Sequence, residues 1–214
     1  MDVRMKKNLF AIGFLGLMPI ISFAYIPSHI NKLNKSDNCQ QCDVTEYIID
    51  NYQKTTFLAE NLNHSYWTAV YLRKVEFRKK SLIHSNFVVS RMFETIFDES
   101  DLSGSNFSNS ECEQCSLKNT KLKNSNFYKA NFEYAQFTNA DLSIARLEKG
   151  VFSNAEFMNV NFLGANLSGA DLSRANLYGS NITQKQLDSL NFYQCATLPD
   201  GTVYDENGEV DCDR

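Results

Sequence analysis

Phenylalanine and leucine recur at every fifth position over most of this chain. Counting in steps of five gives 28 positions from Phe57 to Phe192, and 24 of these centres are Phe or Leu. The residues two positions before the centres form a second set, which runs from Ser65 to Ser180 and is small at every position except Lys80. A helix repeats at about 3.6 residues and a strand at about two, so a period of five fits neither. The pattern therefore predicts a repeated supersecondary unit, as in repeat proteins whose units stack on one another.

Residues 1–24 have the pattern of a secretory signal peptide. Arg4, Lys6 and Lys7 precede an apolar run, Leu9 to Phe23, that ends in Ser-Phe-Ala just before Tyr25. This predicts cleavage before Tyr25 and an exported protein, periplasmic or secreted. A retained membrane anchor is the alternative, but no later segment is apolar enough to span a bilayer, so no stable span is expected after cleavage.

A solenoid exposes backbone and core at both ends, so caps are expected. Asp43 can cap a helix in which Val44 and Ile48 lie on one face, together with Tyr47 and Tyr52. Residues 183–190 predict a second short helix, followed by an acidic tail with a hairpin turn near its end. The chain therefore divides into a signal peptide (1–24), an N-terminal linker and capping helix (25–54), the repeats (55–182) and a C-terminal capping helix with an acidic hairpin (183–214).

Six cysteines in an exported chain suggest disulfides. They are Cys39, Cys42, Cys112, Cys115, Cys195 and Cys212. Cys195 and Cys212 flank the tail hairpin and can join it to the cap. Cys112 is a centre and Cys115 is the next small position, so they can form a bridge across one turn or remain two buried thiols. The two CxxC pairs also raise a thiol redox or zinc-binding function, but the inward register of Cys112 and Cys115 disfavours a shared metal site.

A basic run at residues 73–80 has two interpretations. It can be a patch for nucleic acid or anionic lipid, or its cations can pair with acidic residues on the next coil if a coil takes 20 residues. The spacing favours the second interpretation, because three cations have carboxylates 20 positions further on. These pairs are Lys74 with Glu94, Arg78 with Asp98, and Lys79 with Glu99.

Apolar residues also occur outside the centres and the small positions, and these residues face outward if both of those sets point into the core. This candidate partner-binding face consists of Ile83, Val88, Val89, Phe93 and Ile96. A protein partner can cover it, or residues 25–42 can fold back over it. His64 and His84 are 20 residues apart as well, but two imidazoles without a third ligand make a weak metal site.

The repeat resembles the pentapeptide-repeat family, whose pattern is Ala, Asp or Asn, Leu and two variable residues. Ala-Asp-Leu-Ser-Arg at residues 170–174 matches it in full. The resemblance implies an all-β solenoid, namely a right-handed quadrilateral parallel β-helix of pentapeptide repeats with short helical caps. In it, four units form one coil, and the centre and small residues lie inside. The corners then need a positive φ, which suits Asn and Gly. Such residues are Gly104, Asn109, Asn119, Asn124, Gly164, Gly169 and Gly179.

Some members of that family resemble duplex DNA in shape and charge and bind DNA gyrase, so a gyrase inhibitor is an alternative function. Residues 55–192 carry 14 Lys plus Arg and 14 Asp plus Glu, which is too neutral for a DNA mimic. The sequence also lacks a phosphate-binding loop, an HExxH motif and a nucleophile elbow, so no enzyme, cofactor or nucleic-acid partner is expected. The best prediction is an exported, non-catalytic scaffold that binds an unidentified protein.

Overall fold

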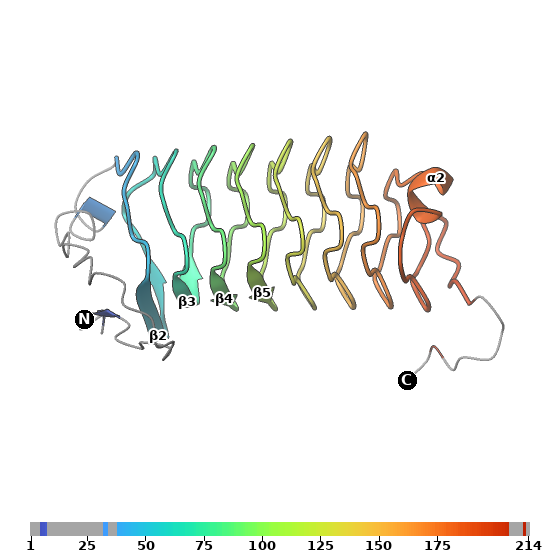
Figure 1. Cartoon of the computed structure of the whole chain (residues 1–214), viewed down its shortest axis with the longest axis horizontal. Coiled ribbons are helices and arrows are strands. Elements are labelled where there is room, and N and C mark those ends of the chain that lie inside the picture. Colours follow the sequence, from blue (N-terminus) through green and yellow to red (C-terminus); the bar gives the residue numbers. More distant parts are fainter. Residues whose placement is uncertain (1–4, 8–31, 34–37, 206–211, 213–214) are drawn as a thin grey trace, which may run out of the picture.

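The computed structural model describes residues 5–7, 32–33, 38–205 and 212, in which the chain winds into a rod of stacked coils (Figure 1). Parallel β-bridges join residues 20 positions apart along most of the rod, as from Asn86 to Asn106 and from Asn106 to Asn126. A coil therefore contains four of the five-residue units. The predicted β-solenoid is confirmed.

Each unit bends the chain at one residue with a left-handed backbone. In the unit centred on Phe107, Asn109 has a φ of 55°, and the amide of Ser110 donates a hydrogen bond of 3.1 Å to the carbonyl of Phe107. This turn recurs from unit to unit and keeps the centre and the small residue inside. All seven Asn and Gly positions expected at corners have positive φ, between 55° and 71°. Asn and Gly suit these positions because they adopt the left-handed conformation at a low cost in free energy.

The core is a column of large side chains along the rod axis. Every centre from Phe57 to Leu187 is buried. The Phe107 ring stacks on Phe87 and Phe127, with ring centroids 4.8 and 5.0 Å apart. The small positions between these rings are buried as well, apart from the half-buried Lys80. Large centres and small neighbours together fill the interior of a narrow tube.

One side of the rod forms a continuous sheet. Strands β2 (Tyr47–Thr56), β3 (Tyr71–Glu76), β4 (Arg91–Phe93) and β5 (Glu111–Glu113) pair in parallel in that order. β1 (Met5–Lys7) lies within the expected signal peptide and pairs antiparallel with β2 at the edge. The other sides of the coils are joined mostly by isolated bridges. The sheet is thus the side on which neighbouring coils pair over the longest stretches.

The predicted N-terminal capping helix is wrong. Its expected second half forms β2, and Asp43, its expected cap, makes a parallel bridge with Tyr66. The physical reason is the five-residue spacing of Val44 and Ile49, which are both fully buried. They are the centres of two more units and not members of one helical face.

The first coil is longer than the others, so its centres do not fall at five-residue steps from Phe57. Asn38 pairs with Asn61, 23 positions further on, whereas Thr55 pairs with Val75, 20 positions further on. The register shifts between residues 50 and 55. Three extra residues there put the N-terminal centres out of phase with the rest of the rod.

The C-terminal end carries the expected short helix, α2 (Gln184–Leu187). Thr183 and Gln186 form a capping box, in which the Thr183 hydroxyl accepts from the Gln186 amide at 3.3 Å and Gln186 Oε1 accepts from the Thr183 amide at 2.9 Å. The Gln186 side chain also donates to the carbonyls of Phe162 and Ala165 at 2.8 and 2.9 Å. The helix therefore satisfies backbone groups of the coil beneath it.

Beyond α2 the register lengthens by one residue. Asp171 pairs with Phe192, 21 positions further on. The assignment of Phe192 as an inward centre is therefore wrong: its side chain is 56% exposed, and Tyr193 packs against the core instead. The predicted hairpin turn, within residues 206–211, lies outside the described residues.

Candidate functional site

The outward face of β3, β4 and β5 carries the most distinctive surface of the rod. Successive side chains of a strand point to opposite faces, so Leu72, Met92 and Cys112 enter the core and their neighbours face outward. We call these outward residues, with their counterparts on the next coil, the strip. The strip consists of Tyr71, Arg73, Arg91, Phe93, Glu111, Glu113, Asn131 and Glu133.

A depression of about 200 Å³ lies within the strip. It is lined by Tyr71, Arg91, Met92, Phe93, Glu111, Glu113 and Asn131. The guanidinium carbon of Arg73 lies 5.7 Å from the centroid of the Phe93 ring, and Arg91 Nε lies 3.2 Å from Glu111 Oε2. Small-molecule pockets usually enclose roughly 300–1,000 Å³, so this depression suits a side chain of another protein better than a cofactor.

The charges of the strip are separated along the rod. Arg73 and Arg91 lie on the coils of β3 and β4. Glu111 and Glu113 lie on the coil of β5, and Glu133 lies on the coil after it. Glu113 and Glu133 make no ion pair with any residue that the structure describes. Neighbouring coils are spaced by ~4.8 Å, so these two stacked carboxylates repel each other.

The structure does not bring the five residues of the expected partner-binding face together. Side chains that stack along the rod are 20 residues apart, and no two of the five have that spacing. Ile83, Val88 and Ile96 are half-buried, and Val89 is 55% exposed on a turn. Only Phe93 lines the depression.

Val89 occupies a turn with an unfavourable backbone for its side chain. Its φ is 58°, which costs an L-residue roughly 1–2 kcal/mol, most of all when the side chain is β-branched. Replacing it, Val89→Asn, is expected to raise the free energy of unfolding by about 1 kcal/mol, because Asn tolerates this conformation. Urea denaturation measures the change. Val88→Asn, one residue earlier with a negative φ, is the matched control, and equal stability of the two variants would contradict the assignment of strain.

The basic run at residues 73–80 is paired across coils, as predicted. Three cations lie 3.1–3.5 Å from carboxylates 20 positions further on, namely Lys74 with Glu94, Arg78 with Asp98 and Lys79 with Glu99. A hydrogen bond to Glu76, 2.8 Å long, raises the pKa of Arg78, and the nearby carboxylates add to this effect against the opposing effect of burial. Each of these three cations is therefore compensated by a carboxylate on the next coil.

All six cysteines are paired in the structure. The three disulfides are Cys39–Cys42, Cys112–Cys115 and Cys195–Cys212, with Cα atoms 5.3, 5.5 and 5.3 Å apart. The first two each join a centre to the next small position across one turn. Their four cysteines are at most 1% exposed. Burial of the sulfur atoms disfavours the thiol redox alternative, since a reactive thiol needs an accessible surface.

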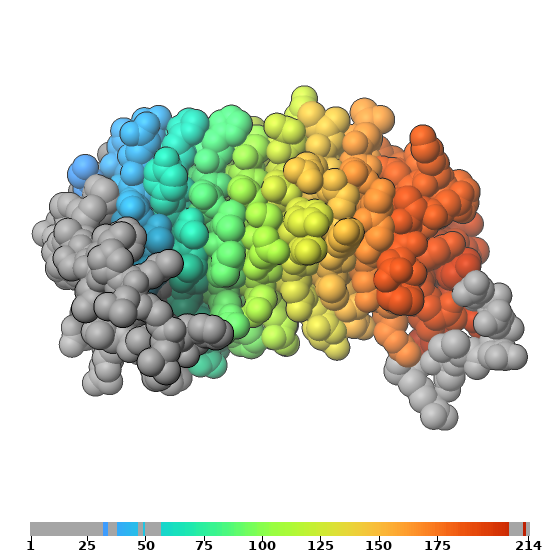
Figure 2. All heavy atoms as spheres, in the orientation of Figure 1, coloured from blue at the N-terminus to red at the C-terminus, as the bar shows by residue number. Residues whose placement is uncertain are grey.

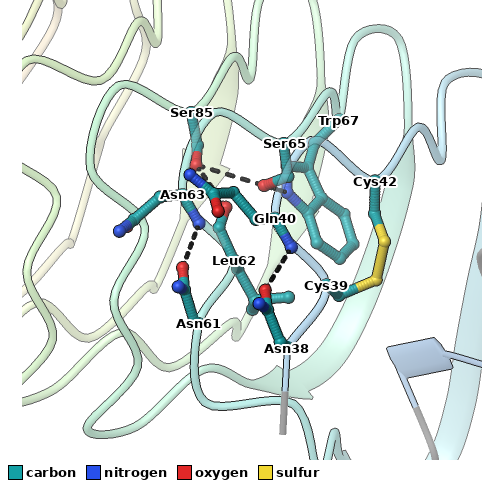
Figure 3. Close-up of a disulfide and its surroundings, with 10 residues drawn as sticks. All are labelled: Asn38, Cys39, Gln40, Cys42, Asn61, Leu62, Asn63, Ser65, Trp67 and Ser85. Atoms are coloured by element: carbon teal, nitrogen blue, oxygen red, sulfur yellow. Dashed lines mark hydrogen bonds between the residues drawn. A yellow bond between two sulfur atoms is a disulfide. The ribbon is translucent and has the colours of Figure 1, made fainter. Parts of the chain in front are cut away.

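The Cys39–Cys42 disulfide lies beside Trp67 in the first coils (Figure 3). Trp67 Nε1 donates to Ser65 Oγ at 2.6 Å, and the Ser85 hydroxyl donates to the Leu62 carbonyl at 2.9 Å. A hydroxyl has one proton, so the 3.1 Å contact between the two serines is a hydrogen bond donated by Ser65. The network is buried and satisfied, and its role is to hold the first coils together.

His64 and His84 stack on neighbouring turns with ring centroids 5.4 Å apart. Within the described residues, no three His, Cys, Asp or Glu side chains gather closely enough to hold a metal ion. The same part of the chain contains no helix with the length and apolar character needed to cross a membrane.

The model of the family described as pentapeptide repeats matches eight copies, in residues 105–143 and 135–179. HetL from the cyanobacterium Nostoc sp. strain PCC 7120, a pentapeptide-repeat protein involved in the regulation of heterocyst differentiation, is 16% identical with a TM-score of 0.53. The match covers 78% of this chain and 86% of HetL.

A second similar structure is QnrB1, a plasmid-mediated fluoroquinolone resistance protein. It is 23% identical with a TM-score of 0.62, and the match covers 71% of this chain and 76% of QnrB1. No curated protein matches the sequence. At these identities the similar structures establish the fold of the chain and nothing more.

Proposed function

We propose that this chain, whose residues 105–179 match the model of the pentapeptide-repeat family, is an exported, non-catalytic scaffold that binds another protein through the strip. The observation that carries this proposal is the depression around Phe93 beside Glu113 and Glu133, whose carboxylates form no ion pair within the described part of the chain. Natural surfaces keep such an unfavourable arrangement where binding compensates for it. A partner would neutralise the carboxylates and bury the aromatic ring.

Two features support a non-catalytic role. The interior is filled by the centres, with fully buried rings such as Phe107 and Phe127. The carboxylates of the strip face outward on a flat wall, with Glu111 and Glu113 exposed. Catalysis by a carboxylate usually depends on an enclosed site that excludes water, and this wall does not provide one.

Membership of the family also suggests the finer geometry of the coil. Four units per coil, each followed by a turn, support a quadrilateral cross-section, with the right-handed winding of the family. In this geometry the strip is one flat wall. A flat wall presents its side chains in fixed rows, which suits recognition of a rigid protein surface.

Export is proposed from the sequence of residues 1–24, and the three disulfides support it because such bonds persist in oxidising compartments. Cleavage before Tyr25 would remove β1 and uncover the edge of β2 at residues 47–49. A gyrase inhibitor is the weaker alternative, because the repeats carry equal numbers of cationic and anionic residues and the basic run is paired.

A photo-crosslinking experiment tests the proposal in the cells that make the protein. A photoreactive amino acid in place of Phe93 is expected to give a covalent adduct with a protein. The same amino acid in place of Ser153, three coils further along the same row, is the matched control and is expected to give none.

Intact-mass analysis of the extracytoplasmic fraction is expected to show a chain that starts at Tyr25. Equal labelling from both positions, or a full-length cytoplasmic chain, would overturn the binding or the export part respectively.

A further inference from the structure

The strip has an order of charges that is complementary to itself. One row of outward residues follows the centres and contains Arg73, Phe93, Glu113 and Glu133; the other row precedes them and contains Tyr71, Arg91, Glu111 and Asn131. The line midway between β4 and β5 divides both rows into two halves of two coils. The cations lie in one half and the carboxylates lie in the other.

Positions at equal distance from this midline form complementary pairs. In the first row, Arg73 and Glu133 lie one and a half coils on either side of it. In the second row, Arg91 and Glu111 lie half a coil on either side, and Tyr71 and Asn131 lie one and a half coils away. A twofold rotation about the midline therefore brings each arginine to the position of a glutamate. It also brings the Tyr71 hydroxyl to the position of the Asn131 amide.

We propose that the partner of the strip is a second copy of this chain, packed face to face with its rod axis antiparallel. In this arrangement Arg73 of each copy faces Glu133 of the other, and the two Arg91–Glu111 pairs meet as a four-charge cluster. A twofold contact of this kind closes on itself, and it repeats every favourable pair twice. The proposal deepens the proposed function and depends on the strip, but not on export.

The midline also crosses the depression. Met92 and Phe93 line it from one coil and Glu111 and Glu113 from the next, so two facing depressions form one shared space. Phe93 and Glu113 are the one pair of positions whose side chains are not complementary, since one is apolar and the other is charged. In the pair of rods, the Phe93 ring occupies this shared space, where it loses contact with water. Glu133, which makes no ion pair with a described residue of its own copy, faces Arg73 of the other.

Sedimentation equilibrium of the full chain at low salt tests the proposal. The wild-type protein is expected to dimerise, and Glu133→Arg, which places two cations opposite each other, is expected to weaken the dimer at least tenfold. The double variant Arg73→Glu/Glu133→Arg is expected to restore the dissociation constant to within a few-fold of wild type. Asp188→Arg makes the same change of charge on the C-terminal side of α2 and is expected to leave the dimer unchanged.

Added salt is expected to weaken the wild-type dimer, and this measurement needs no variant that might fold poorly. A wild-type protein that stays monomeric at all concentrations would overturn the proposal. So would a dimer that survives Glu133→Arg but is lost with Asp188→Arg, which would place the contact at the C-terminal end. A monomer whose residue 93 still crosslinks to a different protein would overturn self-pairing and leave the proposed scaffold function intact. A monomer without any crosslink would overturn both.

Discussion

Phe107→Ala is expected to lower the free energy of unfolding by about 3–5 kcal/mol. The Phe107 ring is fully buried and stacks on Phe87 and Phe127, while the rings of Phe97 and Phe132 meet it edge to face. Neighbouring coils fix the positions of all four rings through their backbone bridges, so the core cannot close around the missing side chain. The loss therefore contains the transfer energy of the ring and the cost of the cavity.

Denaturant unfolding followed by far-ultraviolet circular dichroism measures this change. Ser108→Ala, in the next and outward position, is the matched control and is expected to change stability by less than about 0.5 kcal/mol. A loss below about 1.5 kcal/mol for Phe107→Ala would show that the column of rings relaxes around a gap. It would contradict the description of the core as rigidly packed.

Removal of residues 146–165 is expected to give a folded, shorter rod. The deletion takes out one coil of 20 residues and joins Ala145 to Asn166, so every later centre keeps its phase. Gln186 then meets the carbonyls of Leu142 and Ala145 in place of Phe162 and Ala165. Each coil contacts only its neighbours, so the loss of one leaves the others with equivalent partners.

Removal of residues 146–164 differs from that deletion by one residue and is expected to have a far larger effect. It shifts Leu167, Leu172 and Leu177 out of the core and brings polar neighbours inward. Burial of each leucine contributes roughly 1.5–3 kcal/mol, so the loss is on the order of 5 kcal/mol or more and the C-terminal coils should unfold. Circular dichroism and limited proteolysis compare the two proteins. Equal stability would show that the 20-residue register is not what holds the coils together.

The middle of the fold could be predicted from the sequence because each residue type there follows from one geometric requirement. A buried centre must be large, its inward neighbour must be small, and the turn must accept positive φ. The ends could not be predicted in the same way, because extra residues interrupt the count: three before Thr55 and one after α2. Val44 and Ile49 keep the five-residue spacing, but they are out of phase with Phe57. Phe192 falls on the five-residue count from Phe57, but its side chain is exposed and does not enter the core.

The apolar residues of the sequence indicate only part of the candidate site. They include Phe93 but not the charged residues around it. The sequence signal for these charged residues is their spacing, because Arg73, Phe93, Glu113 and Glu133 follow one another at intervals of 20 residues. The same spacing correctly predicted the ion pairs of the basic run, where opposite charges meet. In the strip, the carboxylates of Glu113 and Glu133 are neighbours instead, and neither forms an ion pair with a described residue.

The position of Trp67 gives the protein a built-in optical probe of one end. It is the only tryptophan of the chain, it lies in the first coils, and it neighbours the Cys39–Cys42 disulfide (Figure 3). The rod extends far from this point toward α2 (Figure 2). Indole fluorescence therefore reports local opening at the N-terminal end, whereas circular dichroism averages over all coils. A difference between the two melting curves would measure how far cooperativity extends along the rod.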